Sequence, residues 1–295
     1  MKIERAYTMA NKKVRLQFLA MERSLRATGF DLPLVVFPYD ENTFDLPKNS
    51  EWLHTPLHQW LTSKKAHPMC SKYFCLTQNS YLFTDTDIVY LRDPRETLSN
   101  MEGFVVADTE WNKPHYTFTE GSARFMAKQT SVWLQNVVNA GWFACDRQIY
   151  TEEKLRRVLE DSETAKTCLY DTDQTGLNLL LAMEGLKPRN LNLPPYSMEA
   201  TWAGDYPGEF ESLWKGPQRK PIFIHWAGPV LDQDRPINEL FYKFLTKDEA
   251  AEWRAEQAVR LEKDRRAGRW PIGLRVLNAV TRLLYPAFRI QPRPR

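Results

Sequence analysis

The first 40 residues alternate between apolar runs and a helical spacing of apolar positions. The run Ile3–Ala10 predicts a first strand. After it, apolar residues recur three or four positions apart until Gly29, which predicts a helix with one buried face; they are Val14, Phe18, Met21 and Leu25. The run Leu32–Phe37 predicts a second, buried strand that opens into a polar loop. Strand, helix and strand in this order are typical of a βαβ unit in a parallel sheet.

Further short apolar runs extend this pattern into one α/β domain over residues 1–240. The expected strands are Tyr81–Phe83, Ile88–Leu91, Gly103–Ala107 and Ile222–Ile224, and the expected helices are Thr151–Glu160 and Gln174–Met183. These segments contain no internal repeat or linker-like stretch, so we expect them to share one core.

Residues 241–295 have a different pattern and are expected to form a helical, basic extension. Lys247–Arg266 predicts a charged helix with few core positions. Trp270–Phe288 predicts an amphipathic helix with a row of arginines beside an apolar face that consists of Leu274, Leu277, Val280 and Leu284. This arrangement suits a helix that lies in a membrane interface. A helix docked on the body with its arginines in solvent has the same pattern, and both interpretations stay open.

The charge distribution separates the chain into the same two parts. The 295 residues carry a formal charge of only +3. Residues 265–295 contain eight arginines and no acidic residue, which is +8 and leaves −5 on residues 1–264. A basic tail favours an anionic membrane surface as a partner. An acidic body without the aromatic-rich motifs of RNA-binding sheets argues against nucleic acid.

Composition and cysteine spacing indicate a folded, cytoplasmic protein. Hydrophobic residues make up 43% of the chain, which excludes an intrinsically disordered one. The N-terminus has no apolar stretch typical of a signal peptide, and no run of roughly 18 apolar residues is long enough to span a bilayer. The four cysteines match neither a zinc ribbon nor a CxxC pair, so we expect reduced, packed thiols.

The segment Asp85-Thr86-Asp87 is the sharpest chemical feature of the sequence. Predicted strands flank it on both sides, which places it at a strand end, where α/β sheets collect ligands. Two carboxylates at positions i and i+2 can converge on one hard cation, and Mg²⁺ or Mn²⁺ accepts such oxygens together with those of a diphosphate. The flanks are apolar, so two charges beside a core indicate a binding site.

Three further segments place polar groups at predicted element ends. A small-residue turn before an apolar strand lets backbone approach a ligand closely, a polar segment begins a helix near an N-cap, and a histidine ends a strand before a tight turn. They are Asn139-Ala140-Gly141, Asp173-Gln174-Thr175-Gly176-Leu177-Asn178 and His225-Trp226-Ala227-Gly228-Pro229. Each has a purely structural interpretation alone, but their combination and order are much more specific.

In these motifs the sequence resembles the metal-dependent GT-A glycosyltransferases, most closely the family 8-like bacterial sugar transferases. The similarity covers about residues 3–242 and leaves the basic tail outside. It implies an α/β fold with a Rossmann-like mixed sheet flanked by helices, and a catalytic domain over residues 1–240. It also implies a nucleoside-diphosphate sugar as donor substrate and Mn²⁺ or Mg²⁺ as cofactor.

Carried over position by position, the resemblance assigns roles to individual residues. Asp85, Asp87 and His225 would hold the cation. Asp173 would bind hydroxyls of the donor sugar, and Gln174 would lie beside its anomeric carbon.

The donor would contact a wider set of positions. Besides Asp85 and Asp87 these are Thr8, Ala10, Asn11, Thr86, Asn139, Ala140, Gly141 and Gly228. The chain departs from the family in two places. Its first loop lacks an acidic residue, and no Lys-Trp pair follows the histidine motif. Lys72 is the substitute cation that we expect to face the diphosphate, and Trp226 is expected to line the donor or acceptor pocket.

The resemblance predicts transfer of a sugar from a nucleoside-diphosphate sugar, most simply a UDP-sugar, to a saccharide acceptor with retention of configuration. With the basic tail, it predicts a lipid-linked or cell-surface oligosaccharide as acceptor and a peripheral location on the inner face of the membrane. Two alternatives remain. Asp85-Thr86-Asp87-Ile88-Val89 also matches the nucleophile motif of haloacid-dehalogenase-type phosphatases, which that fold carries on its first strand. The protein could instead be a non-catalytic membrane-surface scaffold.

Overall fold

The computed structural model describes residues 1–266 apart from 110–116, 132, 136, 215, 217–218, 229–230 and 232–234. Residues Met1–Leu245 form one compact unit, and a second unit begins at Thr246. In the second unit the described part is one helix, α9 (Lys247–Arg266), with the bounds expected from its charge pattern. The amphipathic segment Trp270–Phe288 lies outside the described residues.

A seven-stranded mixed sheet forms the centre of the first unit, with the strand order β3-β2-β1-β4-β7-β6-β8. Strand β7 runs antiparallel to both of its neighbours, and the other pairs are parallel. A second sheet pairs β5 with β9 antiparallel. The strands are β1 (Arg5–Ala10), β2 (Leu34–Pro38), β3 (Ser50–Trp52), β4 (Tyr81–Thr84), β5 (Ile88–Tyr90), β6 (Phe104–Val106), β7 (Trp142–Cys145), β8 (Arg189–Asn190) and β9 (Phe223–His225).

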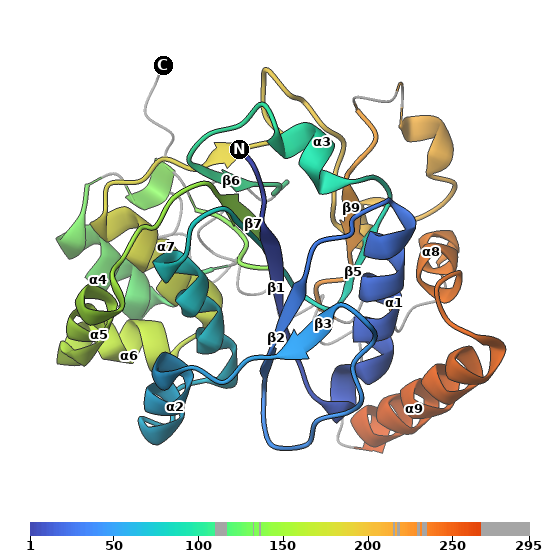
Figure 1. Ribbon diagram of the computed structural model, residues 1–295, viewed down its shortest axis with the longest axis horizontal. Coiled ribbons are helices and arrows are strands. Elements are labelled where there is room, and N and C mark those ends of the chain that lie inside the picture. Colours follow the sequence, from blue (N-terminus) through green and yellow to red (C-terminus); the bar gives the residue numbers. More distant parts are fainter. Residues whose placement is uncertain are drawn as a thin grey trace. The chain divides into compact units, whose positions relative to one another are not determined.

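Helices cover both faces of the seven-stranded sheet. Helix α1 lies on one face, and α2, α5, α6 and α7 lie on the other (Figure 1). The first-unit helices are α1 (Arg15–Ala27), α2 (Pro56–Ser63), α3 (Pro94–Leu98), α4 (Glu120–Gln129), α5 (Glu152–Glu160), α6 (Ser162–Tyr170), α7 (Asp173–Met183) and α8 (Glu239–Tyr242). The predicted α/β fold, with helices around a mixed sheet, is confirmed.

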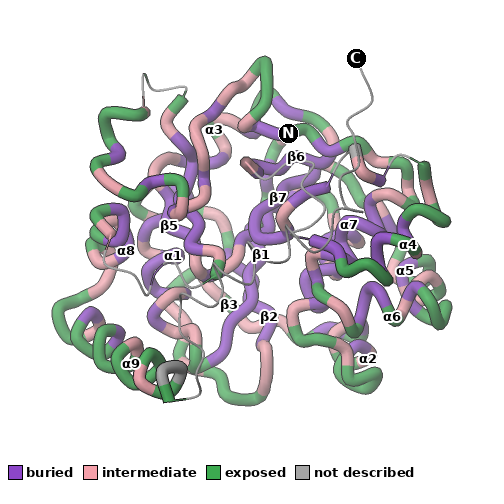
Figure 2. Tube along the Cα trace, turned by 180° about the vertical axis from the view of Figure 1, so that it is seen from behind, coloured by how far each residue is buried: buried purple, intermediate pink, exposed green. Residues whose placement is uncertain are grey.

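The central strands are buried because both of their faces carry apolar side chains. Every residue of β2, β4 and β7 is buried, and β1 is buried from its second residue onward (Figure 2). This matches the continuous apolar runs by which the sequence predicts them. All four cysteines are buried free thiols, as expected.

The two sheets meet where β4 passes into β5, and this junction positions the polar motifs. In β4 and β7, Thr84 pairs with Trp142, so the turn before β7 lies beside the residue that follows β4. The Asp85 N–H donates to the Gly141 carbonyl over 2.7 Å. In the small sheet Ile88 pairs with His225, which brings the end of β9 to the start of β5.

Candidate active site

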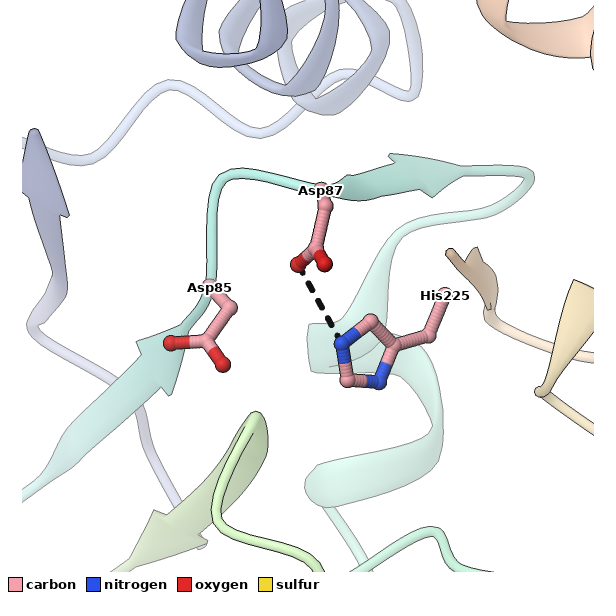
Figure 3. A group of neighbouring side chains, drawn as sticks. All are labelled: Asp85, Asp87 and His225. Carbon is pink, nitrogen blue, oxygen red and sulfur yellow. Dashed lines mark ion pairs between the residues drawn. The ribbon is translucent and has the colours of Figure 1, made fainter. Parts of the chain in front are cut away.

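Asp85, Asp87 and His225 form a cluster at the junction of the two sheets. Asp85 follows β4, Asp87 precedes β5, and His225 is the last residue of β9; Figure 3 shows the three side chains pointing toward one another. One ligand atom from each residue lies within 4.8 Å of the others. The His225 Nε2 lies 3.2 Å from Asp87 Oδ1. The three residues that the resemblance assigns to a cation are thus brought together by the fold.

Backbone contacts fix each member of this cluster. The His225 N–H donates to the Thr201 carbonyl over 2.7 Å, and the next N–H, that of Trp226, donates to the Asp87 carbonyl over 2.8 Å. Gly141 leaves the space that the side chains need. A Cβ at that position would lie 2.4 Å from His225 Cε1 and 3.0 Å from Asp85 Oδ2, too close for any other residue without rearrangement.

Lys72 supplies positive charge directly beside the cluster. Its side chain is 0% exposed, and its Nζ lies 2.6 Å from Asp173 Oδ2 and 3.3 Å from Asp85 Oδ1. The same ammonium donates to the Ala140 carbonyl over 3.1 Å and lies 4.8 Å from the centre of the Phe83 ring. Lys72 therefore joins the β4 end, the turn before β7 and the start of α7. Its ammonium faces the carboxylates of Asp85 and Asp173, and the expected contact with a diphosphate stays a prediction.

The electrostatics of the cluster are set by burial and by these pairings. Burial raises the pKa of Asp85 to about 6. The positive charge of Lys72 opposes this rise, and the negative charge of Asp87 adds to it. Burial also disfavours the charged form of Asp87, but His225 outweighs it by charge and hydrogen bond and lowers the pKa of Asp87. Burial lowers the pKa of His225, but the charge and hydrogen bond of Asp87, together with the charge of Asp85, give a net rise above 6.5. Burial likewise opposes protonation of Lys72, yet Asp173 and Asp85 raise its pKa.

These donors fit a hard divalent cation. Two carboxylates and an imidazole are ligands that Mn²⁺ and Mg²⁺-type sites use, with further positions left for water or phosphate oxygens. The Asp85 and His225 side chains are 14% and 11% exposed, so the cluster is recessed but reachable. Burial is the main cause of the raised pKa of Asp85 and the charge of Asp87 adds to it; a cation bound here would favour the ionised carboxylate.

A second polar network forms beside the cluster around Asn139 and Gln174. The Asn139 Nδ2 donates to Gln174 Oε1 over 2.9 Å, while its Oδ1 accepts from the Gly141 N–H over 2.8 Å. The Gln174 Nε2 donates to Thr117 Oγ1 over 2.7 Å. The buried Asp108 accepts from the Asn139 N–H over 2.6 Å. This network holds the carboxamide of Gln174 against the turn before β7.

The start of helix α7 places Asp173 and Gln174 at the site. Thr172 is the N-cap and accepts from the Thr175 N–H, so Asp173 is the first helical residue and not the cap itself. Asn178, one turn further on, accepts from the Val138 N–H and donates to the Val138 carbonyl. Helix α7 is therefore held against Val138, directly before the 139–141 turn, so the polar motif at 173–178 has a structural role.

The end of β1 carries three of the predicted donor contacts. Thr8 and Ala10 are fully buried, and the Ala10 carbonyl accepts from the Tyr39 N–H over 2.9 Å. The Asn11 Nδ2 donates to Asp40 Oδ2 over 2.8 Å, which ties the loop after β1 to the loop after β2. Neither Thr8 nor Ala10 has any exposed surface, in its side chain or its backbone.

The three remaining predicted residues are buried or lie in a turn. Trp226 is 1% exposed, and its Nε1 donates to Asn238 Oδ1 over 2.8 Å. The expectation that this indole lines a ligand pocket is corrected: it packs in the core because β9 buries the residue that follows His225. Thr86 is 5% exposed. Gly228 has a φ of +79°, which a tight turn after the histidine motif requires.

Sequence reasoning missed two residues near the cluster. Burial of the Tyr39 phenol, together with the charges of Asp85, Asp87 and Asp173, raises its pKa well above 10, so this ring lies within electrostatic reach of the site. Asp108 follows β6 and supports Asn139. Asp108 directly follows the predicted strand Gly103–Ala107, and Tyr39 lies two positions after the predicted strand Leu32–Phe37; such positions at strand ends are the signal that could have found them.

Solved structures share the fold of this chain. No protein-family model matches the chain, and no curated protein does. A solved structure of galactosyltransferase LgtC with donor and acceptor sugar analogues is similar, with a TM-score of 0.56, 13% identity, and coverage of 85% of this chain and 99% of that one. The bifunctional glycosyltransferase WbbM is similar with a TM-score of 0.56 and 14% identity, covering 86% of this chain and 51% of WbbM. The chain has the GT-A fold.

Within the GT-A fold the aspartate pair lies at the junction that follows β4. This position disagrees with the phosphatase alternative, in which the same motif would follow the first strand, because β1 and β2 precede it in the sheet. A third similar structure is an active-site variant of LgtC in which glutamine is replaced by glutamate, with a TM-score of 0.55 and 13% identity.

Proposed function

We propose that the protein is a metal-dependent glycosyltransferase that moves a sugar from a nucleoside-diphosphate sugar to a saccharide acceptor. The observation that carries the proposal is the convergence of Asp85, Asp87 and His225 within 4.8 Å at the sheet junction of a GT-A fold. The family 8-like motif set supports the same assignment independently of the fold. Mn²⁺, or Mg²⁺ in its place, is the proposed cofactor.

The proposed reaction needs charge stabilisation where the diphosphate leaves. A cation held by Asp85, Asp87 and His225 would supply it as a Lewis acid. Removing such a charge clamp costs several kcal/mol, or roughly two to three orders of magnitude in rate. Lys72 favours the charged form of Asp85 and fixes both carboxylates in place, because its ammonium lies within 3.3 Å of Asp85 and of Asp173.

The groups beside the cluster would bind and orient the donor sugar. We propose that Asp173 accepts hydrogen bonds from sugar hydroxyls and that Gln174 presents its carboxamide to the reacting carbon. Gln174 is held by Asn139 and Thr117, so its orientation is set before a ligand binds. The donor would contact the turn formed by Asn139, Ala140 and Gly141.

Base, stereochemistry and acceptor are finer parts of the proposal. We propose UDP as the nucleotide and retention as the outcome, both on the resemblance to family 8-like enzymes. The test is incubation with UDP-, GDP- and CDP-sugars and Mn²⁺, with nucleotide release measured and the product anomer read by proton NMR. Release of UDP with an unchanged anomer supports the proposal. Inversion overturns the retaining part, and release of phosphate from an aryl phosphate supports the phosphatase instead.

We also propose that residues 265–295 bring the enzyme to the inner face of a membrane, where a lipid-linked or cell-surface oligosaccharide would be the acceptor. The support is the charge of +8 on this segment, since each basic residue at an anionic surface contributes about 1 kcal/mol. Among the described residues no helix is long and apolar enough to cross a membrane.

A further inference from the structure

Two histidines lie at the start of helix α2, and we propose that His54 and His58 form a second metal site, which binds a Zn²⁺-type cation through two imidazole nitrogens. His54 precedes the N-cap residue Thr55, and His58 is the third residue of the helix. Their ring centres lie 6.1 Å apart, with the ring planes at 81°. Neither histidine has a part in the proposed sugar transfer, so this inference does not depend on that function.

The separation of the two rings allows one ion to contact both. A nitrogen ligand lies about 2.0–2.1 Å from Zn²⁺, which places the centres of two imidazole rings on one ion roughly 5–6.5 Å apart. The observed 6.1 Å between the ring centres is within this range. His54 is exposed, and its ring makes no hydrogen bond to the residues that the structure describes. It is therefore free to turn its lone pair toward an ion that His58 holds.

The ring of His58 is already oriented as in a metal-binding histidine. Its Nδ1 lies 2.8 Å from the Oγ of Ser71, a residue that is only 4% exposed. Its backbone N–H donates to Thr55 Oγ1 over 3.0 Å, which fixes the start of the helix. A histidine that binds a metal through one ring nitrogen donates from the other to a neighbouring group, which fixes the tautomer and the plane of the ring. With Nδ1 donating to Ser71, the lone pair of Nε2 is left for the ion.

The donor set of this site selects a different class of metal from that of the candidate active site. Among the described residues, a group of three or more possible metal ligands occurs only at the candidate active site, so water would complete the coordination at His54 and His58. Imidazole nitrogens suit Zn²⁺, Ni²⁺ and Cu²⁺, whereas Mg²⁺ and Mn²⁺ prefer carboxylate oxygens. Burial and the nearby charge of His54 lower the pKa of His58, which favours the neutral ring that a metal requires.

An ion at this position would connect three segments of the first unit. His54 belongs to the loop after β3, His58 to α2, and Ser71 to the 3₁₀ segment Pro68–Thr77, which also carries the buried Lys72. An ion that binds only the folded protein stabilises it in a concentration-dependent manner. Zn²⁺ should therefore raise the midpoint of thermal unfolding, and this gain should be smaller in His54→Ala.

The test is a titration of the full chain with Zn²⁺ at neutral pH, followed through the ring C–H resonances of its five histidines by proton NMR. The resonances of His54 and His58, identified with the variants His54→Ala and His58→Ala, should shift together with one midpoint. Mg²⁺ at the same concentration should leave both unchanged, because two imidazoles offer it no oxygen ligand. Since these signals report their own site, Zn²⁺ bound at His225 does not obscure them.

Calorimetry on the same proteins counts the ions and measures their affinity. His54→Ala and His58→Ala should each bind one Zn²⁺ fewer than the wild type. Ser71→Ala should weaken Zn²⁺ binding at this site about tenfold or more, because it removes the partner of Nδ1. His67→Ala is the matched control, since His67 is an exposed histidine of the same part of the chain and its Nδ1 accepts from the Met69 N–H. It should bind as many ions as the wild type.

The outcomes separate this inference from the proposed function. If the resonances of His54 and His58 do not move with Zn²⁺, or if His54→Ala binds as many ions as His67→Ala does, the second metal site is refuted. Neither result affects the transferase proposal, because Mn²⁺-dependent UDP binding reports on the candidate active site alone. If Zn²⁺ binds through His54 and His58 while UDP does not bind with Mn²⁺, the second metal site stands and the transferase proposal is refuted.

Discussion

Replacing Lys72 by methionine removes a buried positive charge from between two carboxylates. The Lys72 side chain is 0% exposed, with its Nζ at 2.6 Å from Asp173 and 3.3 Å from Asp85. Methionine fills a similar space, so the change removes charge with little loss of packing. Deleting one partner of a buried ion pair costs about 3–5 kcal/mol because the remaining charge is left uncompensated. For a domain of this size, that lowers the unfolding midpoint by roughly 6–20 °C.

Urea unfolding followed by circular dichroism, without added metal, measures this loss directly. Lys187→Met is the matched control, since Lys187 is exposed and its replacement should change stability by no more than about 0.5 kcal/mol. The double variant Lys72→Met/Asp173→Asn should recover part of the loss, because one of the two stranded carboxylates is gone. A loss below about 1 kcal/mol for Lys72→Met, with no recovery in the double variant, would refute the reasoning that Lys72 balances the site's charge.

Three further predictions concern the cluster and the tail. Gly141→Ala should weaken Mn²⁺ binding about tenfold or more, because the new methyl group displaces the His225 ring. The control Gly208→Ala adds a methyl group that meets nothing within 4 Å, so calorimetry should find its Mn²⁺ affinity unchanged. Mn²⁺ affinity should be highest above pH 7 and fall as the pH drops through about 6, because protons on Asp85 (pKa about 6) and His225 (pKa raised above 6.5) compete with the cation. The affinity should fall by up to about tenfold per pH unit for each proton bound, and an affinity independent of pH between 8 and 5.5 would contradict this. Deleting residues 265–295 should reduce co-sedimentation with phosphatidylserine vesicles in a salt-sensitive manner and preserve UDP binding, whereas loss of UDP binding would make the tail structural.

The hydrophobic pattern was sufficient to predict the parts of the fold that carry the site. The apolar run at residues 81–83 became β4, and the run at 88–91 became β5, so the aspartate pair lies between two strands as predicted. The positions of Gly141 and His225 at element ends were also predictable. Strand ends can be recognised in a sequence because the apolar run stops there and polar residues begin.

Long-range pairing was not predictable from the same pattern. Lys72 and Asp173 are 101 positions apart, and only the packed fold reveals that they form a 2.6 Å ion pair. Trp226 looked like a ligand contact because of its neighbour His225, but β9 turns the indole into the core. Burial of a single side chain depends on which elements pack against its strand, and local spacing carries no such information.

The most direct measurement of the central claim is a calorimetric titration of UDP into the wild-type protein and Asp87→Asn, each with and without Mn²⁺. Asparagine keeps the shape of the side chain and removes the charge. Asp45→Asn, at an exposed position, is the control. We predict that Mn²⁺ tightens UDP binding about tenfold or more in the wild type and in the control, and that Asp87→Asn abolishes this gain. UDP binding that is the same with and without Mn²⁺, or a gain that survives in Asp87→Asn, would contradict the account.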